Sequence, residues 1–154
     1  KLNGEVHANS ISIRTSILGL DPDEHKGLLE HVLKKEVNKI GYINQIWSGS
    51  TTIQLAKFIE DIIYGDLNIL FNKTHIINFA PLGPVSKYEI ISVFSKIINK
   101  QDIKLKSDKS TPKTTILKSL YLNKSILKSY NQDLADSLLE LLRHDKNYSK
   151  TFKK

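Results

Sequence analysis

The sequence predicts an α/β fold, in which short strands alternate with helices along the chain. Over residues 10–17 a β-strand is predicted, because Ile11, Ile13 and Thr15 alternate with Ser10, Ser12 and Arg14 at the strand period of two, and Gly19 closes the stretch. Apolar stripes at helical spacing recur later, most clearly over residues 51–64 and 132–143. A second strand-like stretch at residues 75–79 separates helical segments, which is the order of elements found in α/β proteins.

Composition indicates a globular domain with a core of its own. The chain has 154 residues, of which 40% are hydrophobic and 25% are charged, and no apolar run approaches the roughly 20 residues of a membrane span. The absence of cysteine excludes disulfides, thiolate catalysis and cysteine-based zinc sites, and it suits a reducing cytoplasm. The net charge of +7 comes from lysines spread along the whole chain, so nucleic-acid binding is an alternative and not the leading interpretation.

The first predicted helix covers residues 24–36, and Asp21 or Asp23 can cap it. His25 and His31 lie six residues apart and do not share a helical face, so we do not expect them to bind a metal. No metal site is predicted in the sequence. The apolar stripe of this helix consists of Leu28, Leu29, Val32 and Leu33.

One or two short strands are predicted over residues 40–47, where Gly41 and Asn44 allow turns. Trp47, the only tryptophan of the chain, ends this stretch. Its ring can stack on a flat ligand or fill the core, and the sequence favours neither alternative.

The most regular helix of the sequence covers residues 51–64, with Ser50 or Thr51 as its N-cap and Gly65 at its end. The glycine and hydroxyl groups of Gly49-Ser50-Thr51-Thr52 form either a plain cap or an anion site at the positive end of the helix dipole. The stripe expected to be buried consists of Ile53, Ala56, Ile59 or Phe58, Ile62 and Ile63.

The second half of the chain begins with the predicted strand at residues 75–79. Residues 81–84, which are rich in proline and glycine, are expected to break the chain. Ser86 can cap a helix that ends near residue 98, with Glu89 completing a capping box.

The remaining elements are shorter, apart from the last helix. An edge strand is predicted over residues 103–106, because lysines alternate with apolar residues there and exposed lysines discourage pairing with a further strand. Residues 107–115 are polar and predict a loop, and residues 120–127 predict a small packed turn. An amphipathic helix over residues 132–143 completes the prediction.

Several stretches carry a resemblance to a known family through their order and spacing, although no single one is specific. They are Lys1-x-x-Gly4-Glu5, Ile13-Arg14-Thr15-Ser16-Ile17-x-Gly19, the run from Trp47 to Ala56, Val85-Ser86-Lys87-Tyr88-Glu89 and Lys118-Ser119-Leu120. The chain thereby resembles the extended short-chain dehydrogenase/reductase family, and within it the dTDP-4-dehydrorhamnose reductase branch. The resemblance covers most of the chain.

This resemblance implies the last strands of a Rossmann-type parallel sheet and a small mixed α/β part that binds the substrate. Residues 1–19 would supply the end of the catalytic helix and a sheet strand, and residues 20–154 mainly the substrate-binding part. No Gly-x-Gly-x-x-Gly follows a strand in this sequence. We therefore expect a C-terminal portion of a longer protein, inactive alone, in which the absent half provides most of the binding site for NAD or NADP.

The resemblance also implies roles for individual residues. Lys1 matches the lysine of the family's Tyr-x-x-x-Lys motif, in which a lysine one helical turn after the tyrosine favours the phenolate form. Lys1 is thus the implied catalytic residue, and Lys1, Thr15 and Ser16 are the implied cofactor-binding residues. Trp47-Ser48-Gly49-Ser50-Thr51 is implied to border the substrate. Ser86-Lys87-Tyr88 is not the catalytic pair, because its lysine directly precedes the tyrosine.

The function implied is hydride transfer from a nicotinamide cofactor to a 4-keto nucleotide sugar in cytoplasmic polysaccharide biosynthesis. An epimerase or dehydratase of the same family is the nearest alternative, and a basic binding module or an interaction domain without chemistry are alternatives of other classes. The expected partners are a nucleotide sugar and, for the complete protein, a second copy. Neither a membrane nor a nucleic acid is an expected partner.

Overall fold

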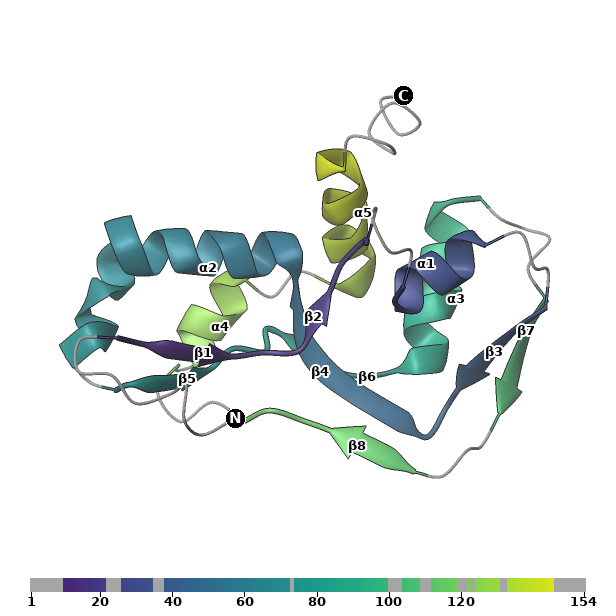
Figure 1. Ribbon diagram of the computed structural model, residues 1–154, viewed down its shortest axis with the longest axis horizontal. Coiled ribbons are helices and arrows are strands. Elements are labelled where there is room, and N and C mark those ends of the chain that lie inside the picture. The colour runs from purple at the N-terminus through teal and green to yellow at the C-terminus, as the bar shows by residue number, and fades with distance from the viewer. Residues whose placement is uncertain are drawn as a thin grey trace.

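The computed structural model confirms an α/β fold with parallel and mixed sheets (Figure 1). The strands of the described residues form three small sheets, and the long strand β4 crosses the middle of the molecule between the other two sheets. Lys1 and residues 146–154 lie outside the described part of the chain. The described residues are 10–21, 26–34, 38–72, 74–99, 104–108, 112–118, 122, 124–130 and 133–145.

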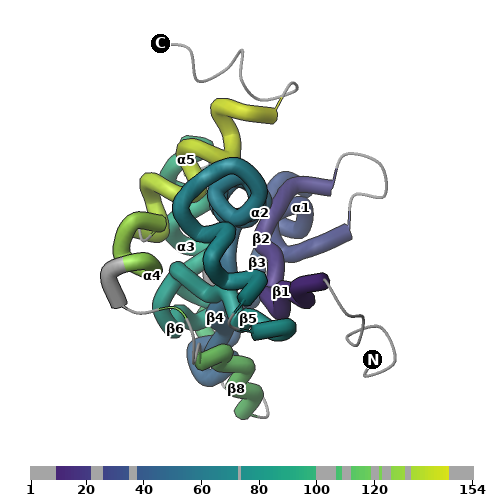
Figure 2. The backbone as a smooth tube through the Cα atoms, turned by 90° about the vertical axis from the view of Figure 1, so that its left-hand side faces the viewer, coloured from purple at the N-terminus to yellow at the C-terminus, as the bar shows by residue number. Residues whose placement is uncertain are grey.

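The first sheet pairs β1 (Ser12–Arg14) in parallel with β5 (Ile76–Asn78). Helix α2 (Thr52–Tyr64) continues into the 3-10 helix η2 (Asp66–Asn72), which leads back to β5. Helix α4 (Lys124–Tyr130) lies beside these elements in Figure 1. Figure 2 looks almost along the axis of α2 and shows β1 and β5 next to it.

The second sheet is built around β4 (Gln45–Thr51). Strand β2 (Ile17–Leu18) pairs in parallel with the end of β4, and β8 (Lys113–Thr115) pairs in parallel with its beginning. Strand β6 (Leu82–Ser86) is antiparallel to β4. Because β4 leads directly into α2, this sheet fixes the position of the α2 N-terminus.

The third sheet pairs β3 (Asn38–Tyr42) in parallel with β7 (Lys104–Asp108). Helix α1 (Leu28–Leu33) and helix α3 (Lys87–Ile97) lie next to it in Figure 1. The last described helix, α5 (Leu134–His144), packs against α3 and α2.

The hydrophobic core is divided into two clusters of buried side chains. The first lies among α1, α3, α5 and β2, and the second among α2, η2, β5 and α4. In the second, the rings of Phe58 and Phe79 stack with centroids 4.1 Å apart, and Tyr130 meets both edge-on. The first cluster contains Leu18, Leu29, Val32, Ile90, Ile91, Phe94, Leu138, Leu141 and Leu142, and the second Phe58, Ile62, Leu70, Ile77, Phe79, Leu122 and Tyr130.

The structure confirms two strands around residues 40–47, the helix over 51–64 with its Thr51 cap, and the strand at 75–79. The helix that follows Ser86 and the last helix are also confirmed. No helix of the described residues combines the length and the apolar character needed to cross a membrane.

The single strand expected over residues 10–17 is wrong, because it is divided into β1 and β2. The carbonyl of Arg14 accepts a hydrogen bond from Phe79 N at 2.9 Å, which holds β1 against β5. The carbonyl of Ser16 accepts one from Ser50 N at 3.0 Å, which holds the chain against β4. The change of partner between these residues ends the first strand.

Helix α1 is shorter at its beginning than predicted. It begins at Leu28 after the N-cap Gly27, and no side chain caps it. The Asp21 carboxylate, expected to cap the helix, instead accepts a hydrogen bond from the Lys26 amide at 3.3 Å in the preceding loop. Asp23 and residues 35–37 lie outside the described residues.

Two segments for which the sequence predicts no strand form strands in the structure. The break expected at residues 81–84 is wrong, because β6 pairs with β4 there. Gly83 and Pro84 lie opposite a register shift in this pairing, where the proline does not have to donate a backbone hydrogen bond to β4. The loop expected at residues 107–115 is wrong, because β7 extends to Asp108 and β8 is an exposed edge strand.

Two helical features also differ from the prediction. The packed turn expected at residues 120–127 overlaps helix α4. In α2, Phe58 and Ile62 are buried, whereas Ile59 and Ile63 are 38% and 54% exposed and Ala56 is exposed as well. The buried stripe is therefore narrower than the apolar residues of the helix suggest.

Candidate functional site

The site begins where β1 and β2 part. Their parallel partners, β5 and β4, diverge on either side of Thr15 and Ser16. In open α/β sheets, ligands bind beyond the carboxyl ends of strands at such a divergence. The carboxyl end of β2, at Leu18, opens into a cavity described below.

Ser16 holds the loop between the two strands against β4. Its hydroxyl accepts a hydrogen bond from the Trp47 indole Nε1 at 2.5 Å, and its carbonyl accepts one from Ser50 N at 3.0 Å. A Cβ on Gly49 would overlap the Ser16 carbonyl oxygen, so only glycine allows this close approach. The contacts fix the plane of the Trp47 ring.

The other hydroxyls of this region point into the protein. Thr15 Oγ1 and Ser50 Oγ share a hydrogen bond of 3.0 Å, and Ser48 Oγ accepts one from Leu117 N at 3.0 Å. Ser48, Ser50 and Thr51 are at most 2% exposed. These hydroxyls are engaged within the protein, and none of the three residues lines the cavity described below.

The N-terminus of α2 is fixed by a buried polar network. Thr51 Oγ1 accepts from Gln54 N at 3.2 Å, and Gln54 Oε1 accepts from Thr51 N at 2.8 Å, which completes a capping box. Gln54 Nε2 donates to Tyr130 O at 2.9 Å and to Ser137 Oγ at 3.1 Å. The start of α2, which borders the cavity, is thereby tied to α4 and α5.

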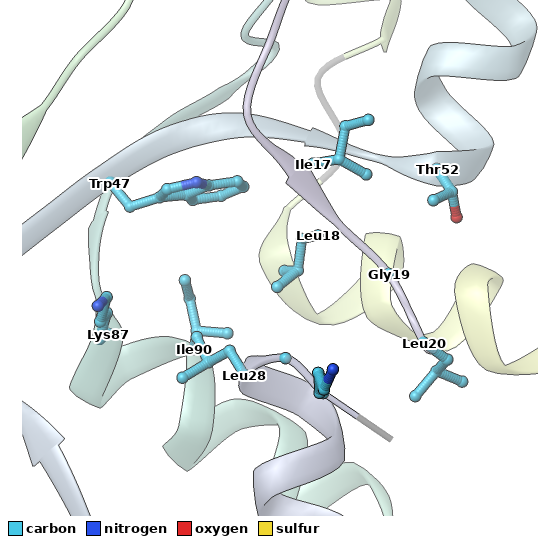
Figure 3. Close-up of a pocket in the computed structure, with 11 residues that line it drawn as sticks. Ile17, Leu18, Gly19, Leu20, Leu28, Trp47, Thr52, Lys87 and Ile90 are labelled. Atoms are coloured by element: carbon cyan, nitrogen blue, oxygen red, sulfur yellow. The ribbon is translucent and has the colours of Figure 1, made fainter. Parts of the chain in front are cut away.

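The first hollow of the site is a cavity of about 410 Å³ at the end of β2 (Figure 3). Its walls are mainly aliphatic, the Trp47 ring lies across one end, and Thr52 of α2 borders the other. Two ammonium groups reach this lining, from Lys26 and from Lys87. The aliphatic residues are Ile17, Leu18, Leu20, Leu28 and Ile90.

A second hollow of about 450 Å³ lies among α1, β3 and α3. It shares Leu28 and Lys87 with the first hollow. Its other lining residues are His31, Asn38, Ile40, Tyr42 and Ile91. Among the described residues that line the two hollows, none is acidic.

This lining suits a ligand with flat or apolar parts and negative charge. Apolar walls with a few polar groups are typical of small-molecule sites, and volumes of 300–1,000 Å³ are common for them. An indole offers a face for stacking, and ammonium groups in partly apolar surroundings attract phosphate strongly. In the described residues no group of three or more His, Asp or Glu side chains lies close enough to hold a metal ion.

The predicted site residues come together in part. Trp47 lines the first hollow and bonds to Ser16, and Thr15 bonds to Ser50. The predicted residues that are not lining residues are Thr15, Ser16, Ser48, Gly49, Ser50 and Thr51. Lys1 lies outside the described residues. Lys26, Leu28 and Lys87 are lining residues that the sequence reasoning missed; for Lys87 the signal was its position directly after the predicted cap Ser86.

The fold belongs to the α/β class and is similar to the Rossmann-like fold of solved reductases. The chain is similar to the dTDP-4-dehydrorhamnose reductase of Bacillus anthracis, solved in complex with NADP, with a TM-score of 0.65 and 16% identity over 97% of this chain. The reductase from Clostridium acetobutylicum gives 0.59 and 16% over 92% of this chain, and that from Yersinia enterocolitica 0.56 and 19% over 84%.

At these identities the likeness shows the fold. The chain spans about half of each of these structures, namely 51%, 48% and 49% of their lengths. No protein-family model matches the sequence, and no curated protein matches it significantly.

Proposed function

We propose that the chain is the substrate-binding portion of a nucleotide-sugar reductase that reduces a 4-keto sugar nucleotide. The observation that carries the proposal is the first hollow, which opens at the end of β2 and combines the Trp47 ring with the ammonium of Lys87. The likeness in fold to dTDP-4-dehydrorhamnose reductases supports it. In this proposal residues 1–19 supply the end of the catalytic helix and a strand of the cofactor-binding sheet, and residues 20–154 mainly the substrate part.

Trp47 provides the stacking surface of the substrate site in this proposal. Its indole N–H is already bonded to Ser16, so the ring face is the part left for a base or a sugar. The segment Ser48–Thr51 acts by holding that ring and the start of α2: Gly49 lets β4 approach Ser16, which bonds to the ring, and Thr51 caps α2. The hydroxyls of Ser48, Ser50 and Thr51 are buried.

A nicotinamide cofactor supplies the hydride in the complete enzyme that we propose. The described residues do not make a dinucleotide site by themselves: Thr15 and Ser16 are half-buried and their hydroxyls are engaged within the protein. We therefore propose that Thr15 and Ser16 lie at the border of such a site. Lys1 is proposed to act beside a tyrosine that is not part of this chain. The complete enzyme in this proposal is a cytoplasmic homodimer, and its glycine-rich half lies outside these residues.

Fluorescence of the only tryptophan tests the proposal, because Trp47 lines the hollow. Addition of dTDP-glucose is expected to change the emission in a saturable way. Trp47→Ala is expected to weaken binding, measured by calorimetry, by about tenfold or more, since base–aromatic stacking contributes roughly 1–3 kcal/mol.

Phe71→Ala is the matched control, because Phe71 lies in η2 outside both hollow linings and is 44% exposed. It is expected to leave the affinity unchanged. The chain alone is expected to bind the sugar nucleotide without oxidising NADPH, followed at the absorbance of the reduced nicotinamide. Absence of saturable binding by the wild-type chain would reject the proposal, and so would turnover without a second half.

A further inference from the structure

We propose that Lys87 is the phosphate anchor of the site, and that the two hollows hold the two ends of one phosphate-linked ligand on either side of it. This inference rests on the proposed function for the class of ligand. It adds a residue that the sequence resemblance does not assign, and it joins the second hollow to the site.

The geometry that carries the inference is the shared lining. Leu28 and Lys87 border both hollows, so a ligand part beside Lys87 reaches either side. The hollows measure about 410 and 450 Å³, so each has room for a ring system. A nucleotide sugar has this form: two ring ends joined through a diphosphate.

The position of Lys87 is fixed by its neighbours. It is the first residue of α3 and directly follows Ser86. The Ser86 hydroxyl accepts a hydrogen bond from the Glu89 backbone N–H at 3.1 Å. The next residue, Tyr88, packs on Gly41 of β3 so closely that a Cβ there would lie 2.8 Å from the Tyr88 Cα. The start of α3 therefore lies directly against β3, and Lys87 at this start lines both hollows.

The charge of Lys87 is not balanced within the described part of the chain. There, the side chain of Lys87, a half-buried residue, has neither a hydrogen-bond nor an ion-pair partner, in contrast to Lys57, which pairs with Glu140 at 2.6 Å. A lysine without such a partner can bind a phosphate group through charge-assisted hydrogen bonds. The described lining residues also include Lys26 and His31 but no carboxylate, which favours an anionic ligand.

Direct binding measurements with dTDP and thymidine test this assignment. Wild type is expected to bind dTDP at least tenfold more tightly than thymidine, and added salt is expected to reduce this difference. Lys87→Met keeps the length of the side chain but removes the charge. It is expected to lower the dTDP affinity about tenfold or more and to leave that for thymidine unchanged, while Lys87→Arg restores part of the loss.

Lys96→Met is the matched control, because Lys96 is an exposed residue of the same helix outside both linings. It is expected to bind dTDP like wild type. Ile40→Trp tests the second hollow, which Ile40 lines while 48% exposed. It is expected to weaken dTDP-glucose binding at least tenfold and to leave pyrophosphate binding intact. Circular dichroism establishes that each variant is folded.

The outcomes separate this inference from the proposed function. Binding of dTDP-glucose that is unaffected by Lys87→Met would overturn the anchor while the reductase proposal stands. An unaffected Ile40→Trp variant would overturn the spanning ligand. Binding of dTDP that depends on Lys87, combined with no binding of any dTDP-sugar, would support the anchor and reject the reductase proposal. A wild-type chain that binds no phosphorylated probe would overturn both.

Discussion

Among single residues, Gly49 determines how closely β4 approaches the loop between β1 and β2. A Cβ at this position would overlap the Ser16 carbonyl and lie 2.5 Å from the Trp47 ring. Both groups are held by hydrogen bonds, so neither can retreat cheaply. We predict that Gly49→Ala lowers the free energy of unfolding by about 2 kcal/mol, the usual size of an overpacking penalty.

Urea unfolding followed by Trp47 fluorescence measures this change. Gly83→Ala is the control, because an added Cβ there meets nothing within 4 Å. It is expected to change stability by less than about 0.5 kcal/mol. Equal stabilities of the two variants would mean that the approach of β4 to Ser16 is looser than described.

Among the secondary-structure elements, α2 and α4 are joined by a bond that depends on pH. The Tyr130 hydroxyl donates to the Asp61 carboxylate, and burial, this hydrogen bond and the charge of Asp61 raise the pKa of Tyr130 well above its usual value of 10.0. Above pH 10 the unfolded chain releases this proton while the folded chain keeps it. Alkaline conditions therefore favour unfolding.

We predict that wild-type stability falls between pH 10 and pH 11.5, and that Tyr130→Phe removes much of this fall while costing about 1 kcal/mol at pH 7. Denaturant titrations at several pH values measure both effects. Tyr64→Phe, at a side chain that is 85% exposed, is expected to keep the wild-type pH dependence. A Tyr130→Phe variant with the wild-type slope would contradict the linkage.

The secondary-structure elements differ in how well the sequence predicts them. Helices α2 and α5 were predictable because apolar periodicity and a capping residue agree in each. Strands β6 and β8 were not, since one contains a proline opposite a register shift and the other is polar and exposed at an edge. Their strand conformation depends on pairing with β4, which is a tertiary interaction that local pattern does not reveal.

In the candidate site, too, local sequence pattern identified some residues, whereas others depend on tertiary contacts. Trp47 and its hydroxyl-rich segment were identified through motif order, and the structure brings that segment next to Thr15 and Ser16. Lys87 was missed because the Ser86 cap already explained its surroundings. Its position between two hollows arises from the packing of α3 against α1 and β3, which joins residues far apart in sequence.

For the whole molecule, the two core clusters are expected to respond differently to a ligand. The first hollow is walled by residues of the first cluster and its neighbours, including Leu18, Ile90 and Trp47. No residue of the second cluster lines either hollow. Binding therefore stabilises the first cluster directly, and reaches the second only through shared elements such as Gln54, which bonds to Tyr130 and Ser137.

Hydrogen exchange with dTDP-glucose present at about 100 times its dissociation constant tests this difference. Such a ligand excess stabilises the binding-competent state by about 2.7 kcal/mol. It should slow the exchange of amides roughly a hundredfold where exchange requires an opening that releases the ligand. We predict this protection in β2, in β4 and at the start of α3. Amides of η2 that exchange by local opening are expected to gain little, because they open without disturbing the hollow. Greater protection in η2 than in α3 would place the ligand against the second cluster.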